Sequence, residues 1–506
     1  MRSQSWVAVA ASCALAVGVC YADRAVMSVA SVAMRDEFAW SSLEQGAVMS
    51  AFYYGYCATM TAGGRAADVR GAKGVMAIGA ATWSAATCAT PAAAARGFIW
   101  LLISRAVMGA GEGVCFPAAH VAIARVVPQE RRSTAIAGVT AASYVGAAFA
   151  FAFAPGIIER FGWEYAFYAF GASMVLWVPT WIPLDLRARD AIAAREGEGE
   201  GENDEERRRL TADEAESRTF KDVEMRTFTA EDAEKANVSA KTVEGQRINA
   251  MDVEMDVFNV DDIEERRLST AEATTTTTTT VDVVEPSGMA IWLEFIKRRE
   301  VKAICVAQFA QSFGMYGLLS WLPTYFHDAQ GVELGNLPAF TFLPYILQGG
   351  VGFGVGVLAD ELINNRAVPT KRVRQWSQGI GMVGPAIALV VAASPLCDHD
   401  AVAAAIAVDC GLALSALTLA GVSVSHLDIA PRHAGLVFAT GNTCSTLAGI
   451  VGVPLIGAVL DASHQSWPLV FALLASVYVL GAGYWIYNLG VDVIDDDVRI
   501  ACVLSS

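Results

Sequence analysis

The sequence predicts an all-α membrane protein, with twelve transmembrane helices in two pseudo-symmetric six-helix bundles. Of its 506 residues, 54% are hydrophobic and only 17% are charged, which is too apolar for an ordinary soluble protein of this size. The apolar residues gather in long blocks, several of about 20 residues, the length that a helix needs to cross a bilayer. Basic residues in the short loops alternate between many and few, as expected of loops on opposite sides of a membrane.

Twelve apolar blocks follow one another along the chain. They cover residues 6–34, 43–63, 74–94, 98–124, 133–157 and 164–186, then 300–327, 337–360, 373–394, 401–425, 433–459 and 466–490. The first block continues past Asp23 and Arg24 to Met34, which is too long for a cleaved secretory signal. We therefore interpret it as the first transmembrane helix.

The charge of the short loops predicts their side. Loops on the side of the N-terminus carry twelve basic residues: Arg2, Arg65, Arg70, Lys73, Arg125, Arg131, Arg132, Arg366, Lys371, Arg372, Arg374 and Arg432. The opposite loops carry three, namely Arg35, Arg96 and Arg160. Because cytosolic loops are enriched in lysine and arginine, we expect both termini in the cytosol.

An acidic segment separates the two sets of blocks. Residues 187–290 hold 27 acidic and 14 basic side chains, a balance of −13 within a formal net charge of −16. Such a segment cannot offset its conformational entropy by burying apolar surface. We expect an N-terminal bundle at 1–186, a disordered cytosolic loop at 187–290, a C-terminal bundle at 291–490 and a short cytosolic tail at 491–506.

Other function classes lack their sequence signatures. The ten cysteines are scattered singly without a metal-ligand spacing. We find no nucleophile–base constellation, so we expect neither an enzyme nor a bound metal or cofactor. Nothing indicates nucleic acid. We expect a monomer whose partners are the lipid bilayer and a small substrate.

The loop after the second block carries the most specific motif of the sequence. Glycine there lets two helices approach closely, and an acidic residue at a helix end can meet the positive end of a neighbouring helix. The Gly-x-x-x-Asp spacing recurs after the eighth block, which favours duplicated bundles. We interpret Gly64, Asp68, Gly71 and Lys73, with Asp360 of the second half, as a conformational latch.

Ionisable residues inside predicted spans are costly and usually face a cavity. Arg24 lies in the first span, and Arg105 and Glu112 lie two helical turns apart on one face of the fourth. Two guanidiniums offer forked donors for phosphate or carboxylate, and a nearby carboxylate can carry a proton or accept a cation. We expect Arg24 and Arg105 to bind an anion, and Glu112 and His120 to serve in coupling to Na⁺ or H⁺.

A different interpretation of these residues is purely structural. Arg24 would then pair with Asp23, Arg105 would pair with Glu112, and His120 would be a packed or hydrogen-bonded side chain. The sequence leaves both interpretations open.

Four stretches carry a family resemblance. They read YADRAVMSVA at 21–30, RAVMGAGEGVCFPAAH at 105–120, SWLPTYF at 320–326 and HLDIAP at 426–431. With the latch motif they resemble the anion:cation symporter family of the major facilitator superfamily, which includes sodium/phosphate cotransporters, and most closely its plant plastid phosphate transporter branch. The resemblance covers all twelve blocks and excludes 187–290.

The resemblance implies the major facilitator fold and secondary active transport by alternating access. In this family the arginines matching Arg24 and Arg105 recognise the anion, and the acid matching Glu112 serves ion or proton coupling. Gln311 stands where vesicular glutamate carriers have an arginine, and approximately Met49 where they have a histidine, which argues against glutamate. We therefore expect transport of inorganic phosphate with Na⁺ or H⁺.

Two alternatives remain. The chain could carry an organic anion such as ascorbate, glutamate or another carboxylate, or it could be a nutrient sensor built on a transporter fold. Because no Ser/Arg-rich leader precedes the first block, we expect a multi-pass protein of the plasma membrane or an endomembrane. The plastid envelope is the expected membrane if the N-terminus is truncated.

Overall fold

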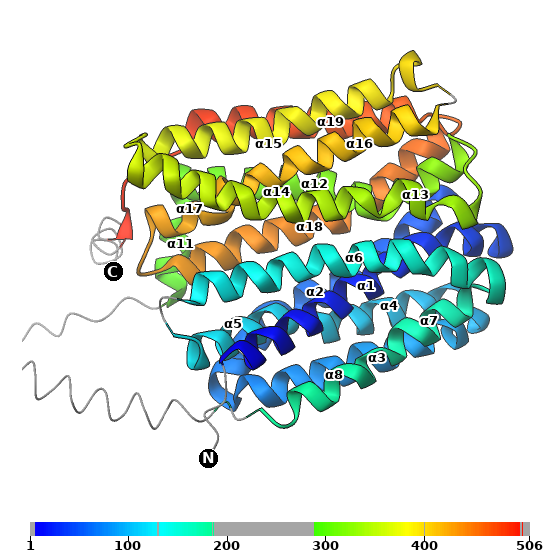
Figure 1. Ribbon diagram of the computed structural model, residues 1–506, viewed down its shortest axis with the longest axis horizontal. Coiled ribbons are helices and arrows are strands. Elements are labelled where there is room, and N and C mark those ends of the chain that lie inside the picture. The colour runs from blue at the N-terminus through cyan, green and yellow to red at the C-terminus, as the bar shows by residue number, and fades with distance from the viewer. Residues whose placement is uncertain are drawn as a thin grey trace, which may run out of the picture. The chain divides into compact units, whose positions relative to one another are not determined.

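The computed structural model describes residues 6–128, 131–184, 186, 288–398, 400–495 and 498. These residues form packed helices, and no strand occurs among them (Figure 1). The acidic segment expected at 187–290 lies outside the described residues, except for its last three, which begin a helix at Gly288.

The six blocks of the first half coincide with helical stretches. The helices are α1 (Trp6–Phe38), α2 (Ser42–Arg70), α3 (Ala72–Arg96), α4 (Phe98–Glu112), α5 (Cys115–Val126), α6 (Arg132–Phe161), α7 (Trp163–Ala172) and α8 (Met174–Trp181). The fourth span consists of α4 and α5, because Pro117 has no N–H to donate to the carbonyl of Gly113, where the helix is interrupted. The sixth span consists of α7 and α8.

The second half repeats this plan with more interruptions. Its elements are α11 (Gly288–Lys297), α12 (Arg299–Asp328), η2 (Leu334–Asn336), α13 (Pro338–Thr341), α14 (Leu343–Asp360), η3 (Glu361–Asn365), α15 (Thr370–Ala392), η4 (Pro395–Cys397), α16 (Ala401–Ser415), η5 (Ala416–Ala420), α17 (Val422–Ile429), α18 (Ala434–Ala462) and α19 (Trp467–Asn488). The tenth span runs from α16 through η5 to α17. The short helix α11, which precedes the seventh span, was not expected from the sequence.

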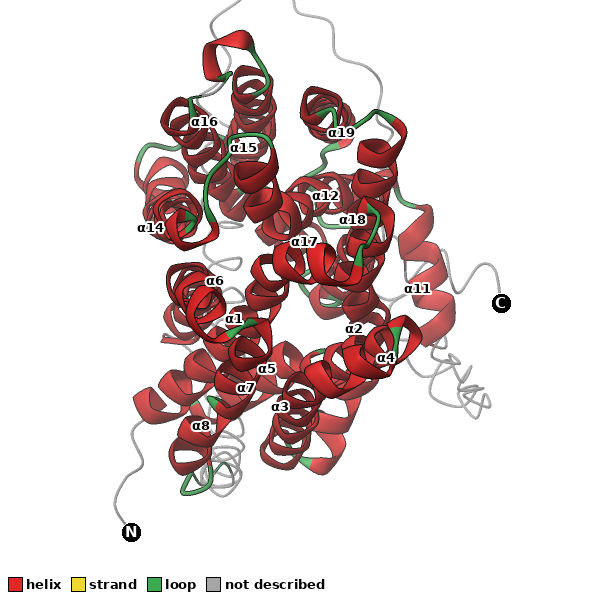
Figure 2. Cartoon of the chain, turned by 90° about the vertical axis from the view of Figure 1, so that its right-hand side faces the viewer, coloured by secondary structure: helices red, strands yellow, loops and turns green. Residues whose placement is uncertain are grey.

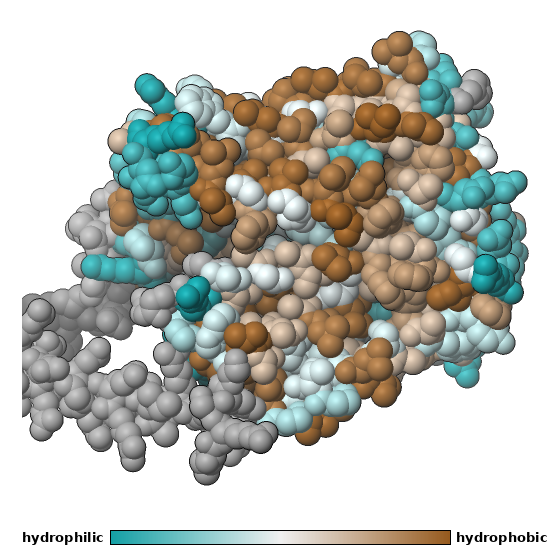
Figure 3. All heavy atoms as spheres, viewed as in Figure 1, coloured by the Kyte–Doolittle hydropathy of each residue, from teal (hydrophilic) through white to brown (hydrophobic). Residues whose placement is uncertain are grey.

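Length and composition identify seven of the described helical stretches as able to cross a membrane. They are Trp6–Phe38, Phe98–Val126, Thr134–Phe161, Pro338–Asn365, Ala401–Ile429, Ala434–Ala462 and Trp467–Asn488. The remaining predicted spans are helical too; the sixth, for example, is divided into helices of 10 and 8 residues. Figure 3 shows apolar residues over the middle of the helices and hydrophilic residues towards both ends. The predicted fold class is confirmed.

The two halves use one pattern of helix contacts. In the first half α1 packs against α6 and α7, α2 against α4, and α3 against α4 and α7; in the second half α12 packs against α18 and α19, α14 against α16, and α15 against α16 and α19. Each contact of the first half therefore recurs six spans later. Between the halves α2 packs against α18, α6 against α14 and α1 against α12 (Figure 2). Exchanging the halves converts the first of these pairs into the second, so the bundles are pseudo-symmetric.

The helices have two distinguishable ends. We call the end at which α1 begins and α19 ends the terminal end, and the opposite end, where α1 ends and α2 begins, the distal end (Figure 1). The latch motif after α2 lies at the terminal end, and the α1–α2 connection lies at the distal end.

Glycines bring α2 and α4 into direct backbone contact. A Cβ atom at Gly109 would overlap the carbonyl oxygen of Phe52, and one at Gly55 would overlap the carbonyl oxygen of Ala106. Small residues allow such close approach of helices within a bilayer. The contact also fixes the ring of Phe52, which lies against the guanidinium of Arg24 in the centre of the first half.

We predict that Gly109→Ala destabilises the protein, because the added methyl group forces α2 and α4 apart. Overpacking of this kind costs about 1–3 kcal/mol, which thermal unfolding of the purified protein in detergent would detect. Gly354→Ala is the matched control, since a Cβ there has nothing within 4 Å. Equal unfolding temperatures for the two variants would contradict the close contact.

Candidate functional site

A buried ion pair occupies the centre of the N-terminal half. Arg24 of α1 donates from Nε to Oε2 of Glu112, at the end of α4, at 2.7 Å, and the side chains are 5% and 0% exposed. Cys20, one helical turn before Arg24, donates from Sγ to the same oxygen at 2.9 Å. The other oxygen of Glu112 is buried without a hydrogen-bond partner among the described residues. One carboxylate oxygen is thus held by two donors, and the second remains available.

Three aromatic rings surround the guanidinium of Arg24. Its Cζ lies 4.5 Å from the ring centre of Tyr21, 4.4 Å from that of Phe52 and 4.7 Å from that of Tyr56. The faces of aromatic rings attract cations, more strongly where water is excluded. These rings from α1 and α2 therefore stabilise the charge of Arg24 and restrict its orientation. The sequence did not assign them this role.

Arg105 contributes a second buried guanidinium from α4. The residue is 2% exposed, and its Cζ lies 5.9 Å from the ring centre of Phe52. Its Nη1 lies 2.7 Å from the sulfur of Met108, and its Nε has no hydrogen-bond partner among the described residues. Among the described residues, Arg105 makes no ion pair with Glu112. The N–H groups of its guanidinium are therefore not bonded to a strong acceptor of the protein.

Asp23 is a second carboxylate that sequence reasoning considered only as a partner for Arg24. It is fully buried, and neither of its oxygens has a hydrogen-bond partner among the described residues. Its charge interacts with those of Glu112 and Arg105. The ionised cluster contains two cations, Arg24 and Arg105, and two anions, Asp23 and Glu112, so its net charge is zero. The sequence could have identified Asp23 as a site residue, because it is a second ionisable group in the same span as Arg24.

A cavity connects the two arginines with the second half. It is lined by Arg24, Met27, Ser28, Met49, Phe52, Tyr53, Arg105, Leu319 and Ser320. The first seven residues come from α1, α2 and α4, and the last two come from α12. The site that holds the cationic donors therefore lies at the contact between the halves.

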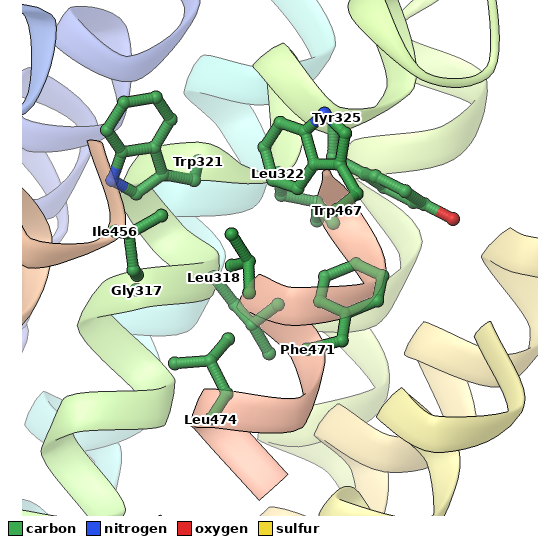
Figure 4. Close-up of a pocket in the computed structure, with 10 residues that line it drawn as sticks. Gly317, Leu318, Trp321, Leu322, Tyr325, Ile456, Trp467, Phe471 and Leu474 are labelled. Carbon is green, nitrogen blue, oxygen red and sulfur yellow. The ribbon is translucent and has the colours of Figure 1, made fainter. Parts of the chain in front are cut away.

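A second pocket has a different chemistry. It lies between α12, α18 and α19, with Trp321, Leu322, Trp467 and Phe471 in its wall. Figure 4 shows aliphatic and aromatic side chains around the space, with the hydroxyl of Tyr325 directed away from it. No charged residue is in this lining, so it offers nothing that would recognise an anion.

His120 does not join the ion-pair cluster. It lies on α5, and its Nδ1 forms a hydrogen bond of 2.8 Å with the carbonyl oxygen of Phe116 on the same helix. The ring of Phe116 contacts both His120 and Tyr21, which in turn contacts Arg24. Two aromatic rings, those of Phe116 and Tyr21, therefore lie between His120 and Arg24, and the coupling role of His120 stays a prediction.

The predicted latch residues lie at the terminal end. Gly71 joins α2 to α3 with φ of 94°, a conformation that favours glycine. The carbonyl oxygen of Asp68 accepts from Nη2 of Arg125 at 2.7 Å, and Lys73 donates from Nζ to the carbonyl oxygens of Ile182 and Leu184 at 2.6 Å. Lys73 thus holds the end of the sixth span.

Two other members of the predicted latch have fewer partners. A Cβ at Gly64 would lie 3.4 Å from Pro117, in close contact with α5. The carboxylates of Asp68 and Asp360 make no ion pair with described residues. The latch function stays a prediction.

The comparisons with known proteins point to one family. The family model described as "Major Facilitator Superfamily" matches residues 13–453. A "Probable anion transporter 1, chloroplastic" from Oryza sativa subsp. japonica is 30% identical over 96% of this chain and 76% of that protein. A "Sodium-dependent phosphate transport protein 1, chloroplastic" from Arabidopsis thaliana is 29% identical over 96% and 79%. An "Ascorbate transporter, chloroplastic" from the same plant is 28% identical over 92% and 72%.

Solved structures agree on the fold. The structure described as a D-xylose–proton symporter superposes with a TM-score of 0.63 at 13% sequence identity, covering 96% of this chain and 99% of that one. At this identity the likeness supports the arrangement of the helices and says nothing of the substrate.

We predict that Arg24→Ala destabilises the protein by about 3–5 kcal/mol, because it leaves Glu112 buried without its cation. The double variant Arg24→Ala/Glu112→Gln should recover much of this loss, since it removes the uncompensated charge as well. Thermal unfolding of the four proteins of this cycle measures the interaction. An additive outcome, with no recovery in the double variant, would show that the two side chains do not depend on each other.

Proposed function

Because the chain belongs to the major facilitator superfamily and its relatives are anion transporters, we propose that it moves inorganic phosphate across a membrane by alternating access, coupled to H⁺ or Na⁺. The unused donors of Arg24 and Arg105 in one cavity are the observation that carries this proposal. Arginine presents a planar fork of N–H groups that matches the oxygens of phosphate. Ser28 and Ser320 add hydroxyl groups from opposite sides of the cavity.

The protein leaves guanidinium donors available to a ligand. Arg24 uses Nε for Glu112 and Nη2 for the sulfur of Cys20, at 2.7 and 3.7 Å. Arg105 uses Nη1 for the sulfur of Met108, which is a weak acceptor. An anion between the two arginines would therefore gain charge-assisted hydrogen bonds without first displacing a strong acceptor from Arg105.

The cluster has zero net charge when all four side chains are ionised, and in that state an anion would need a cation. A phosphate ion that joins two buried arginines and two buried carboxylates adds uncompensated negative charge in a surrounding of low dielectric constant, which is costly. A proton or Na⁺ on Glu112 or Asp23 would restore the balance. It would also weaken the ion pair between Glu112 and Arg24. Arg24 could then reorient and donate hydrogen bonds to the anion. Coupling then follows from electrostatics, and the same argument applies to either cation.

We propose that the terminal end faces the cytosol, as the basic loops predict. The names of the relatives place those proteins in chloroplasts. The plastid envelope is therefore a candidate membrane for this chain, beside the plasma membrane and endomembranes.

We predict gradient-driven uptake of radiolabelled phosphate by proteoliposomes that contain the purified protein. Arg105→Ala should reduce uptake roughly 10- to 100-fold, since a hydrogen bond to a charged group contributes about 1.5–3 kcal/mol. Arg105→Lys should recover only part, because lysine keeps the charge and loses the fork. Arg96→Ala, an exposed arginine in the last turn of α3, serves as the control. Uptake of ascorbate or glutamate but not phosphate would assign an organic anion instead, and no uptake of any anion would favour a sensor.

The coupling role of Glu112 has its own test. We predict that Glu112→Gln retains exchange of labelled for unlabelled phosphate but loses accumulation driven by a cation gradient by about tenfold or more, because the amide imitates a carboxyl group that is permanently neutral. Glu333→Gln, in an exposed loop, is the matched control. Gradient-driven accumulation at the level of the unmodified protein would exclude Glu112 from coupling.

A further inference from the structure

Polar side chains continue along α1 from the arginine cavity to the distal end. Ser28, Ser31 and Arg35 follow Arg24 at intervals of four, three and four residues. This spacing places all four on one face of the helix. Ser28 lines the cavity, and Arg35 lies in the last turn of α1.

The facing helix of the second half carries a matching row. On α12, Ser320, Thr324 and Asp328 follow one another at intervals of four residues. Ser320 lines the same cavity, Thr324 is buried, and Asp328 is the last residue of the helix. Because α1 packs against α12, the two rows form a polar column at the contact between the halves.

Gln45 of α2 interrupts this column just beyond the cavity. Its Nε2 donates to Oγ of Ser31 and to Oγ1 of Thr324, at 3.0 Å each. The side chain is fully buried, and its Oε1 has no partner among the described residues. One amide group thus joins the first half, through Ser31, to the second half, through Thr324.

Further bonds between the halves lie at the distal rim. Arg35 pairs with Asp328 through Nη1 and Nη2. The N–H groups of Ser42 and Leu43, which begin α2, donate to the two carboxylate oxygens of Asp461 at 2.9 and 2.8 Å. Nε2 of Gln465 also donates to Oγ of Ser42, at 2.9 Å. Away from the distal rim and Gln45, the described residues show one more hydrogen bond between the halves, from Asn442 to the sulfur of Met60.

These polar groups have an energetic consequence in a membrane. Apolar side chains could close the contact without leaving a polar group to satisfy, and polar residues in a membrane bundle mark paths for ions and substrates. We propose that the column is the distal half of the substrate's path and that Gln45 is its inner barrier. When the halves part, the hydroxyls of Ser31 and Thr324 and the guanidinium of Arg35 become free to solvate a passing anion. This inference rests on the proposed function for the nature of the ligand, but not for the existence of the path.

The barrier can be tested without a substrate. A cysteine introduced by Ser28→Cys lies on the cavity side of Gln45, so a membrane-impermeant thiol reagent applied at the distal side reaches it only when the barrier opens. We expect Gln45→Ala to speed this labelling about fivefold, the effect of a lost hydrogen bond on an equilibrium. Sealed vesicles of a single orientation expose only one end of the protein to the reagent. The same chain without Ser28→Cys gives the background labelling of the native cysteines.

Gln348→Ala is the matched control. Gln348 is also a buried amide with one unpaired oxygen, but its Nε2 bonds Ser415 at 2.9 Å within the second half. We expect it to leave distal labelling unchanged. Ser320→Cys, on the facing helix, reports the same opening if the first reporter fails to fold.

Distal labelling that Gln45→Ala leaves unchanged, or that Gln348→Ala raises equally, would overturn the barrier. Faster labelling in Gln45→Ala together with no phosphate uptake by the unmodified protein would retain the path and remove phosphate as its substrate.

Discussion

Four charges buried in an apolar interior constrain the rest of this structure. Burying a carboxylate or a guanidinium is costly unless it is paired, and two of the four charges are paired where α1 and α4 meet, Arg24 with Glu112. The glycine contact of α2 with α4 brings Phe52 to the guanidinium, and Cys20 supplies a second donor to the same carboxylate oxygen. The N-terminal half is thus organised around a cluster that is neutral when its four groups are ionised.

The halves contribute unequally to the cavity. Both arginines belong to the first half, whereas the second half supplies Leu319 and Ser320 and no charge to the lining. An anion would therefore remain attached to the first half while the second half, which brings no charge to the lining, moves against it. Hydrogen bonds of ordinary strength, such as those of Gln45, suit a contact that must form and break in every cycle. The four charges of the buried cluster stay within one half, where they need not separate when the halves move.

Composition and periodicity predicted the helices, their number and their pairing into two bundles, because lipid leaves a spanning chain little choice but to form helices. Arg24, Arg105 and Glu112 could be selected for the same reason, since each is a costly group inside a span. The partners of these residues could not be predicted, because they depend on how each helix is rotated about its own axis. Arg24 turned out to pair with Glu112 and not with its neighbour Asp23. Gln45 has no signal in the sequence, since a single amide becomes a barrier only through residues on two other helices.

The central claim is that the neutral cluster accepts an anion only together with a cation. The most direct measurement is the amount of H⁺ or Na⁺ that the purified protein takes up when phosphate binds, in weakly buffered solution with and without Na⁺. The Arg105→Ala variant, which should bind phosphate poorly, gives the background signal from protonation of phosphate itself. The account predicts cation uptake that accompanies binding, with affinity rising as H⁺ or Na⁺ increases. Phosphate that binds equally well at every pH and Na⁺ concentration, without cation uptake, would contradict it.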